Sequence, residues 1–240
     1  MLKKHPAFCK HVSTFVCVSD AITQRLPKSW RDRAVTIPSA VIDRWYRTHQ
    51  LARPKMRTLL HIPKDRPTVI WTGRINDPYK RADLLAQLVT DFPNCTFIIA
   101  AITTSETSTA IEMQLEEAPN TIVLRDFSPS ELIPIYAAAD IGLSTSDMEG
   151  LSISSLEMLA SSLPLLLTAA DGALELVDDG INGFVVPCGD YPKLADALRH
   201  LLSLSVTQRM TMGNASSVKA ATTFAFSTYI AAYCALYERT

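Results

Sequence analysis

The chain has 240 residues, of which 48% are hydrophobic and 20% charged, and its formal net charge at pH 7 is −1. This length can bury one large core or two small ones, and this composition excludes disordered and fibrous classes of protein. A net charge near zero gives no whole-chain reason to expect binding to nucleic acid.

The first 43 residues contain a short strand–helix–strand pattern. Residues 14–18 are β-branched and aromatic, as in a buried strand, and Ser19 and Asp20 precede a short helix over 21–26 that Pro27 ends. A second short strand is expected over 34–37, before Pro38. Such a fragment is too small to be a domain by itself.

Residues 44–67 are predicted to be a basic linker. Residues 44–66 hold seven Lys or Arg against one acid, and three prolines interrupt the segment. A solvated interdomain linker is favoured over a patch for nucleic acid or lipid. A weak peripheral membrane contact through 44–66 stays open, because a local basic cluster attracts anionic lipid even when net charge is near zero.

From Thr68 onward, apolar strands and helices alternate regularly. Strands are expected at 68–72, 96–101, 121–124, 141–143, 163–168 and 184–186. Helices are expected at 80–90, 106–117, 128–139, 152–161, 173–177, 192–202, 207–221 and 227–238. Continuous apolar strands between helices predict an α/β fold with a parallel sheet covered on both faces.

The strand over 68–72 ends in Gly73 and Arg74, with Lys80 at the start of the next helix. Glycine lets a ligand approach the backbone, while Arg74 and Lys80 could clamp a diphosphate. The alternative is a solvated Arg and Lys beside an ordinary turn. No Gly-x-Gly-x-x-Gly and no P-loop sequence occurs, so nicotinamide-dinucleotide and P-loop functions lose their main support.

Two carboxylates bracket the junction between the strand at 141–143 and the helix from Ser152. Glu149 lies in the loop, and Glu157 lies in a helix with mostly apolar neighbours. Ligands bind outside the carboxyl ends of strands in such sheets, where helix amides attract anions. The amides of Gly150, Leu151 and Ser152 are therefore expected to face this crevice. The alternatives are a solvent-facing Glu157 and a Glu149 that only complements the helix dipole.

A third candidate turn follows the strand at 163–168. Gly172 opens a short helix with Glu175 in its first turn. The alternative is simple capping of this helix by Asp171.

These motifs occur in one order: Gly73-Arg74 with Lys80, Glu149-x7-Glu157, Gly172-x-x-Glu175, and Asp179-Gly180-Ile181-Asn182-Gly183-Phe184. Together they resemble the nucleotide-sugar-binding half of family 4 glycosyltransferases, which are retaining enzymes of the GT-B fold. The resemblance implies a Rossmann-like doubly wound parallel sheet at 68–222 and a C-terminal crossover helix at 223–240. Residues 15–41 are similar to the end of the family's N-terminal domain, so residues 1–43 are expected to be its remnant.

The resemblance also implies roles for individual residues. Arg74 and Lys80 would bind the donor diphosphate, and Glu149 would lie beside the transferred sugar; these three are the expected catalytic residues. Glu157 would hydrogen-bond the donor ribose. The remaining expected substrate-binding residues are Gly73, Gly150, Leu151, Ser152, Gly172 and Glu175. No metal and no cofactor is expected, with the nucleotide-diphosphate sugar as co-substrate.

The acceptor domain of such enzymes is nearly absent from this chain, so three hypotheses compete. The first is a glycosyltransferase or its donor-binding half, the second a non-catalytic nucleotide-sugar-binding subunit that needs a partner chain, and the third an α/β protein used only for interaction. Asp171 stands where the family usually has glycine. The five scattered cysteines favour reduced thiols and a cytoplasmic location.

Overall fold

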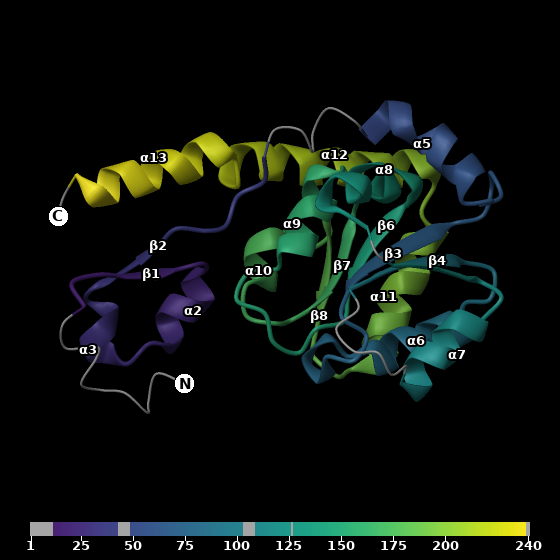
Figure 1. Cartoon of the computed structure of the whole chain (residues 1–240), viewed down its shortest axis with the longest axis horizontal. Helices are drawn as coiled ribbons and strands as arrows, with labels where there is room; N and C mark the ends of the chain where they lie inside the picture. The colour runs from purple at the N-terminus through teal and green to yellow at the C-terminus, as the bar shows by residue number, and fades with distance from the viewer. Residues whose placement is uncertain (1–11, 43–48, 103–108, 126, 239–240) are drawn as a thin grey trace.

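The computed structural model describes residues 12–42, 49–102, 109–125 and 127–238. Figure 1 shows a large unit, in which a sheet lies between helices, and a small N-terminal module beside it. The N-terminal module comprises residues 12–42. The long helices α12 (Val206–Thr223) and α13 (Phe226–Tyr237) run along one side of both parts.

The large unit is built on a six-stranded parallel sheet with strand order β5-β4-β3-β6-β7-β8. The strands are β3 (Thr68–Gly73), β4 (Thr96–Ala101), β5 (Thr121–Leu124), β6 (Ile141–Ser144), β7 (Leu165–Thr168) and β8 (Gly183–Val186). The chain builds outward from β3 to β5, then returns to place β6 against the other side of β3. This reversal is the point at which doubly wound sheets open a ligand crevice at the carboxyl ends of the strands. The expected doubly wound parallel sheet is confirmed.

Helices cover both faces of the sheet (Figure 1). One face carries α5 (His49–Leu59), α8 (Pro129–Ala138), α9 (Ile153–Ala160) and α12, and the other carries α6 (Ala82–Asp91), α7 (Ala110–Glu117) and α11 (Tyr191–Ser203). Alternate residues of β3 point to opposite faces of the sheet. Ile70 packs in the hydrophobic cluster under α8 and α9, and Val69 and Trp71 pack in the cluster under α6 and α11. Burial on both sides explains why the strands are apolar throughout.

Helix α8 begins at the predicted capping position. The carboxylate of Glu131 accepts a hydrogen bond from the backbone N–H of Ser128 at 2.7 Å. This contact satisfies an amide that the helix leaves without a partner. The local sequence therefore fixes where α8 starts.

The solvated linker expected over 44–67 is wrong for residues 49–59, which form α5 and pack against α8. Arg57 is buried and donates to the carbonyl oxygens of Ala138 at 3.0 Å and Pro63 at 2.6 Å. Arg53 pairs with Asp140 at 2.6 Å. Two of the seven basic side chains therefore hold α5 against the sheet, which leaves fewer cations for a lipid surface.

The N-terminal module contains a two-stranded parallel sheet of β1 (Phe15–Cys17) and β2 (Ala34–Thr36). Ser19 caps α2 (Asp20–Arg25), as its sequence predicts, and a further short helix, α3 (Lys28–Arg31), follows Pro27. The module returns to the large unit where the N–H of Val41 donates to the carbonyl oxygen of Phe224 at 2.9 Å.

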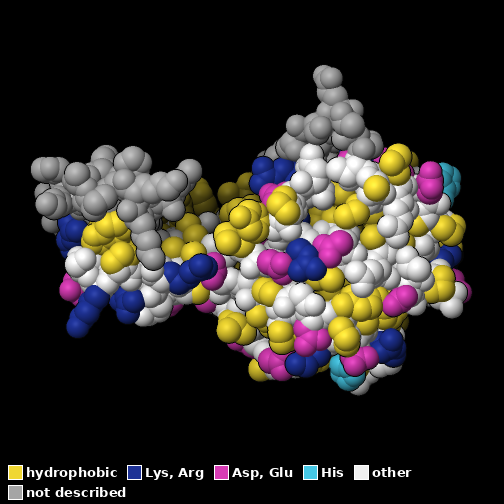
Figure 2. All heavy atoms as spheres, turned by 90° about the horizontal axis from the view of Figure 1, so that it is seen from below, with side chains coloured by type: hydrophobic (Ala, Val, Ile, Leu, Met, Phe, Trp, Pro, Cys, Tyr) yellow, Lys and Arg dark blue, Asp and Glu magenta, His cyan; other side chains and the backbone are white. Residues whose placement is uncertain are grey.

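Figure 2 shows how the charged side chains are distributed over one face of the molecule. Over the described residues drawn in Figure 2, Lys and Arg side chains are scattered among Asp and Glu without forming one basic patch. Among the helices of the described ranges, none combines the length and hydropathy needed to cross a membrane.

Candidate functional site

The candidate site lies at the carboxyl ends of β3 and β6, where the sheet reverses its order. Gly73 is the last residue of β3. A Cβ atom added to Gly73 would lie 3.0 Å from Cη2 of Trp71 and 3.4 Å from Cδ of Lys80. The Trp71 ring would have to shift by a few tenths of an ångström to admit a Cβ atom at this position, which favours glycine here.

An ion pair joins the two loops that frame this crevice. The Nζ of Lys80 pairs with Oε1 of Glu149, and the Ser146 hydroxyl donates to the same oxygen at 3.1 Å. Both side chains of the ion pair are only 20% exposed. Partial burial strengthens their attraction relative to a surface pair, since water screens it less. The predicted Lys80 and Glu149 therefore meet in the fold.

Lys80 is not in the first turn of a long helix, as expected, but in the short 3-10 turn η2 (Pro78–Lys80). Arg81 follows it in a left-handed conformation, with φ of 50°, and separates η2 from α6. The Asp77 side chain caps η2 by accepting from the N–H of Tyr79 at 3.0 Å. This turn directs Lys80 toward the loop after β6.

Hydrogen bonds that the sequence did not reveal hold the two loops in place. The Trp71 indole N–H donates to Oγ1 of Thr145 at 3.1 Å, and the Thr145 hydroxyl donates to the carbonyl oxygen of Lys80 at 2.7 Å. The N–H of Asp147 donates to the carbonyl oxygen of Tyr79 at 2.8 Å. A buried tryptophan needs a hydrogen-bond partner for its indole N–H. Trp71, in an apolar strand, was therefore the one residue from which this network could have been predicted.

Arg81 adds a second link between these loops. Its guanidinium donates to both carboxylate oxygens of Asp83 at 2.8 Å and to Asp147 at 2.8 Å. The guanidinium lowers the pKa of Asp83, and the hydrogen bonds to both carboxylates raise that of Arg81. The sequence did not indicate a role for Arg81, because its two partners, Asp83 and Asp147, lie in segments that only the fold brings together.

Arg74 follows Gly73, the last residue of β3, and its role as a diphosphate ligand stays a prediction. Its side chain is half-exposed and pairs with Asp77 at 2.9 Å. The structure therefore places Arg74 beside the crevice, with its charge engaged outside the Lys80–Glu149 pair.

Helix α9 starts at the crevice, with Ser152 as its N-cap, and Gly150 and Leu151 precede it. The Ser152 hydroxyl accepts from the N–H of Ser155 at 3.3 Å. The buried Ser155 hydroxyl has no hydrogen-bond partner within the described part of the chain, and it lines a cavity of about 10 Å³ together with Glu149. A cavity of this size holds about one water molecule.

Glu157 is half-buried on α9 and faces the same side of the sheet as α8. Its Oε2 accepts a hydrogen bond from the Tyr136 hydroxyl at 3.0 Å. Glu157 is therefore not a solvent-facing helix acid, and Tyr136 is a neighbour that the motif did not reveal.

The third predicted turn leads into α10 (Ala173–Leu176) and contacts both Glu149 and the N-terminal module. The N–H of Gly172 donates to the Glu149 carbonyl oxygen at 3.4 Å, and a Cβ on Gly172 would lie 2.4 Å from the Gly150 carbonyl oxygen. Glycine is therefore required by the close approach of two backbones.

The carboxylates of this turn bind the N-terminal module. Glu175 Oε1 accepts from the N–H of Ala21 at 3.2 Å, and Asp171 pairs with Arg25 at 2.5 Å. Asp171 does not cap α10, since the cap residue is Gly172 and makes no side-chain cap bond. The extra acid at Asp171 is thus neutralised by the module.

Comparison with known proteins assigns the large unit to a family. The sequence model described as Glycosyl transferases group 1 matches residues 66–204, more than half of the chain. The D-inositol 3-phosphate glycosyltransferases of Mycobacterium bovis and Mycobacterium tuberculosis are 26% identical over 193 residues, which cover 78% of this chain and 40% of each relative. The chain thus spans about 40% of the length of these curated relatives.

Solved structures share the fold of nearly the whole chain. Sucrose-phosphate synthase from Thermosynechococcus elongatus superposes with a TM-score of 0.87 at 19% identity, covering 99% of this chain and 61% of that one. HepE from Anabaena, solved in complex with UDP and glucose, has a TM-score of 0.83 at 18% identity, covering 96% of this chain and 64% of that one. These similarities extend through the N-terminal module.

Proposed function

Because the chain belongs to the glycosyl transferases group 1 family, we propose that its six-stranded unit binds a nucleotide-diphosphate sugar in the crevice between β3 and β6. We further propose that, together with an acceptor domain, it transfers that sugar with retention of configuration. The observation that carries the proposal is the Lys80–Glu149 ion pair at the reversal point of the sheet.

The diphosphate is the group that Lys80 would hold. Lys80 reaches the crevice from a turn braced by Thr145 and Arg81, so its ammonium is already placed there. Arg74 would add a second cation, and the amides of Gly150, Leu151 and Ser152 would contribute partial positive charge at the start of α9. Cations and dipoles placed in advance stabilise a leaving diphosphate as its charge develops. This scheme assigns no role to a metal or cofactor.

Glu149 and Glu157 would bind different parts of the donor. Glu149 would lie beside the sugar, where a carboxylate stabilises an oxocarbenium-like transition state. Its present partner Lys80 would then be shared with the diphosphate. Glu157 would accept hydrogen bonds from the ribose hydroxyls, and Gly73, Gly172 and Glu175 would shape the rest of the site.

A second candidate is a non-catalytic nucleotide-sugar-binding subunit that works with a partner chain. The exposed surface of the N-terminal module and α13 supports the presence of a partner chain, which this candidate requires. No residue of α13 is buried, although the helix is rich in aromatic side chains, and β1 and β2 form only a two-stranded parallel sheet. Parallel sheets are ordinarily covered on both faces. A partner supplying an acceptor domain would cover these surfaces.

Isothermal titration of the whole chain with UDP, GDP and ADP tests the proposal. We expect one of them to bind at or below millimolar concentration, and the matching nucleoside monophosphate to bind more weakly because it lacks the second phosphate. Binding of none of the three diphosphates would overturn both candidates. If sugar transfer appears only when a chain with an acceptor domain is added, the chain is an enzyme half; binding without transfer under that condition favours the non-catalytic subunit.

A further inference from the structure

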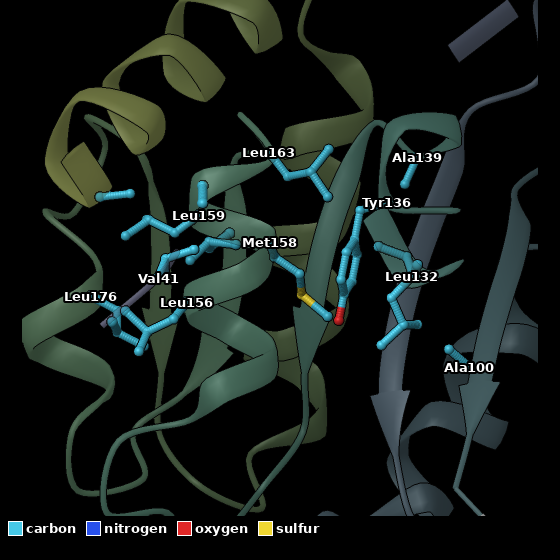
Figure 3. Close-up of a cluster of buried hydrophobic side chains, with 14 of the residues drawn as sticks. Val41, Ala100, Leu132, Tyr136, Ala139, Leu156, Met158, Leu159, Leu163 and Leu176 are labelled. Carbon is cyan, nitrogen blue, oxygen red and sulfur yellow. The ribbon is translucent and has the colours of Figure 1, made fainter. Parts of the chain in front are cut away.

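Three residues from separate elements meet at a buried hydroxyl beside the proposed ribose site. Tyr136 on α8 is completely buried, and its ring lies beside Leu132 and Met158 (Figure 3). Its hydroxyl lies 3.1 Å from Oγ1 of Thr72 and 3.0 Å from Oε2 of Glu157. Thr72 comes immediately before Gly73 at the end of β3. The phenol thus connects β3, α8 and α9 at the crevice.

The hydroxyl of Tyr136 needs an explanation because its surroundings are largely apolar. Its neighbours in the cluster include leucine, isoleucine and alanine side chains, against which phenylalanine would pack equally well. Burying a hydroxyl costs free energy unless it is hydrogen-bonded. The bond to Glu157 supplies that compensation, and it is stronger than a neutral bond because the carboxylate is charged.

The direction of this bond follows from the chemistry of the two groups. A phenol carries one hydrogen, and an ionised carboxylate only accepts, so Tyr136 donates to Glu157. Burial, with the nearby charge of Glu157 as a second cause, raises the pKa of Tyr136 well above its ordinary value. The phenol therefore keeps its proton at neutral pH. A carboxylate held at one oxygen has its second oxygen oriented as well.

We infer that Tyr136 is a positioning residue, which orients the Glu157 carboxylate toward the ribose hydroxyls of a nucleoside diphosphate. The inference rests on the proposed function, because it takes Glu157 as the ribose ligand. Thr72 contributes indirectly, because its hydroxyl contacts the phenol oxygen of Tyr136 and helps to hold it in place. Neither Tyr136 nor Thr72 is assigned a contact with the donor.

The test compares UDP with 2′,3′-dideoxy-UDP, which lacks both ribose hydroxyls, by isothermal titration of the full chain. If GDP or ADP is the nucleotide that binds, its own dideoxy analogue replaces this pair. Tyr136→Phe should reduce the preference for the ribonucleotide by about threefold to tenfold, as for one lost hydrogen bond, while the dissociation constant of the dideoxy analogue stays constant. Thr72→Val should reduce the preference less. In a Glu157→Gln background, Tyr136→Phe should have no further effect, because the two residues act as one unit.

Tyr191→Phe is the matched control. It also removes a phenol donor to a carboxylate, Asp91 at 2.6 Å, but Tyr191 packs on the opposite face of the sheet. An equal loss of ribose preference in Tyr191→Phe would overturn the inference. So would an unchanged preference in a folded Tyr136→Phe, or in Thr72→Val if Tyr136→Phe fails to fold by circular dichroism.

The proposed function and this inference fail in different ways. If the wild-type chain binds no nucleoside diphosphate, the proposed function is wrong and the positioning role falls with it. If the wild-type chain binds and prefers the ribonucleotide, and Tyr136→Phe keeps that preference, only the positioning role is wrong.

Discussion

The six-stranded unit and the N-terminal module both alternate strands with helices, yet only the first encloses a core. The large unit has a buried hydrophobic cluster on each face of its sheet. In the module, β1 and β2 have three residues each, and neither α2 nor α3 has a buried residue. Three or more strands, or packing against a larger body, are needed before such a pattern is stable. The module has only two strands, so its stability depends on packing against the large unit.

The module is held at its edges by the unit it contacts. Arg25 and Ala21 bind the acids of the turn before and within α10, and Val41 bonds to the end of α12. The same local pattern therefore gives a self-sufficient unit or a dependent one, according to how much apolar surface it can bury. The N-terminal module also contacts the turn around Gly172 and Glu175, which we propose helps to bind the donor.

The largest expected effect tests whether stability resides in the six-stranded unit. Phe97 is completely buried in β4, whereas Phe15 of β1 is half-buried and stacks on Trp30 with ring centroids 5.5 Å apart. Phe97→Ala should lower the free energy of unfolding by about 3–5 kcal/mol, because it leaves a cavity in a packed core. Phe15→Ala should cost about 1 kcal/mol. Urea unfolding followed by circular dichroism measures both, and equal losses would contradict the comparison.

The second prediction places nucleotide binding in the same unit. Lys80→Ala and Glu157→Ala should each weaken binding by about 1–3 kcal/mol, the range for a lost hydrogen bond to a charged group. Lys193→Ala is the control and should bind normally, because among the described residues the exposed Lys193 side chain pairs only with Asp190, the N-cap residue of its own helix. Unchanged calorimetric affinity in both site variants, with the fold intact, would overturn the site assignment.

Glu149→Ala separates the sugar from the nucleotide. Its proposed partner is the sugar, so turnover in the presence of an acceptor domain should fall more than affinity for bare UDP. Loss of its carboxylate also leaves Lys80 without its present partner in the crevice, which favours diphosphate binding. A loss of bare-nucleotide affinity as large as that of Lys80→Ala would contradict this role.

The fourth prediction uses pH to distinguish the buried unit from the exposed helix. Burial raises the pKa of Tyr136 well above 10.0 and that of Cys95 from 9.0 to about 12. The unfolded chain loses these protons first as pH rises, so the stabilisation is complete below about pH 9 and is lost above it. Each group contributes a slope of up to about 1.4 kcal/mol per pH unit.

Urea midpoints measured from pH 8 to pH 11 check this prediction. Tyr136→Phe should flatten the decline above pH 10, because phenylalanine has no proton to lose. Tyr237→Phe, on the exposed α13, is the control and should leave the decline unchanged. Identical pH profiles for wild type and Tyr136→Phe would show that this phenol is not protected by burial.

The smallest effect concerns the attachment of the module. Arg25 is largely exposed, so its ion pair with Asp171 should contribute between about 0 and 1 kcal/mol. Arg25→Ala should speed amide exchange in residues 15–26 and leave exchange in β3, β4 and β6 unchanged. Arg199→Ala, which breaks an exposed pair within α11, should leave the exchange of residues 15–26 as it is. Faster exchange throughout the sheet in Arg25→Ala would show that the unit depends on the module.

The sequence by itself determined the strands of the large unit and the start of one of its helices. Continuous apolar runs identified all six strands of the sheet, since burial on both faces demands them. Ser128 and Glu131 marked the start of α8, and the order of Gly73, Lys80, Glu149 and Glu157 indicated the family. These features depend on neighbours in the chain or on a simple periodicity.

Only the tertiary structure decided how the site is held. α5 looked like a linker because of its charges and its internal Pro54, but Arg57 is buried among carbonyl oxygens that the sequence does not place nearby. Likewise, Tyr136 meets Glu157 across 21 residues, and Arg25 meets Asp171 across 146. Hydrogen bonds and ion pairs depend on distances of about 3 Å that exist only after the sheet has formed. The periodicity of a sequence predicts where the strands are, but it does not predict which side chains come into contact in the folded protein.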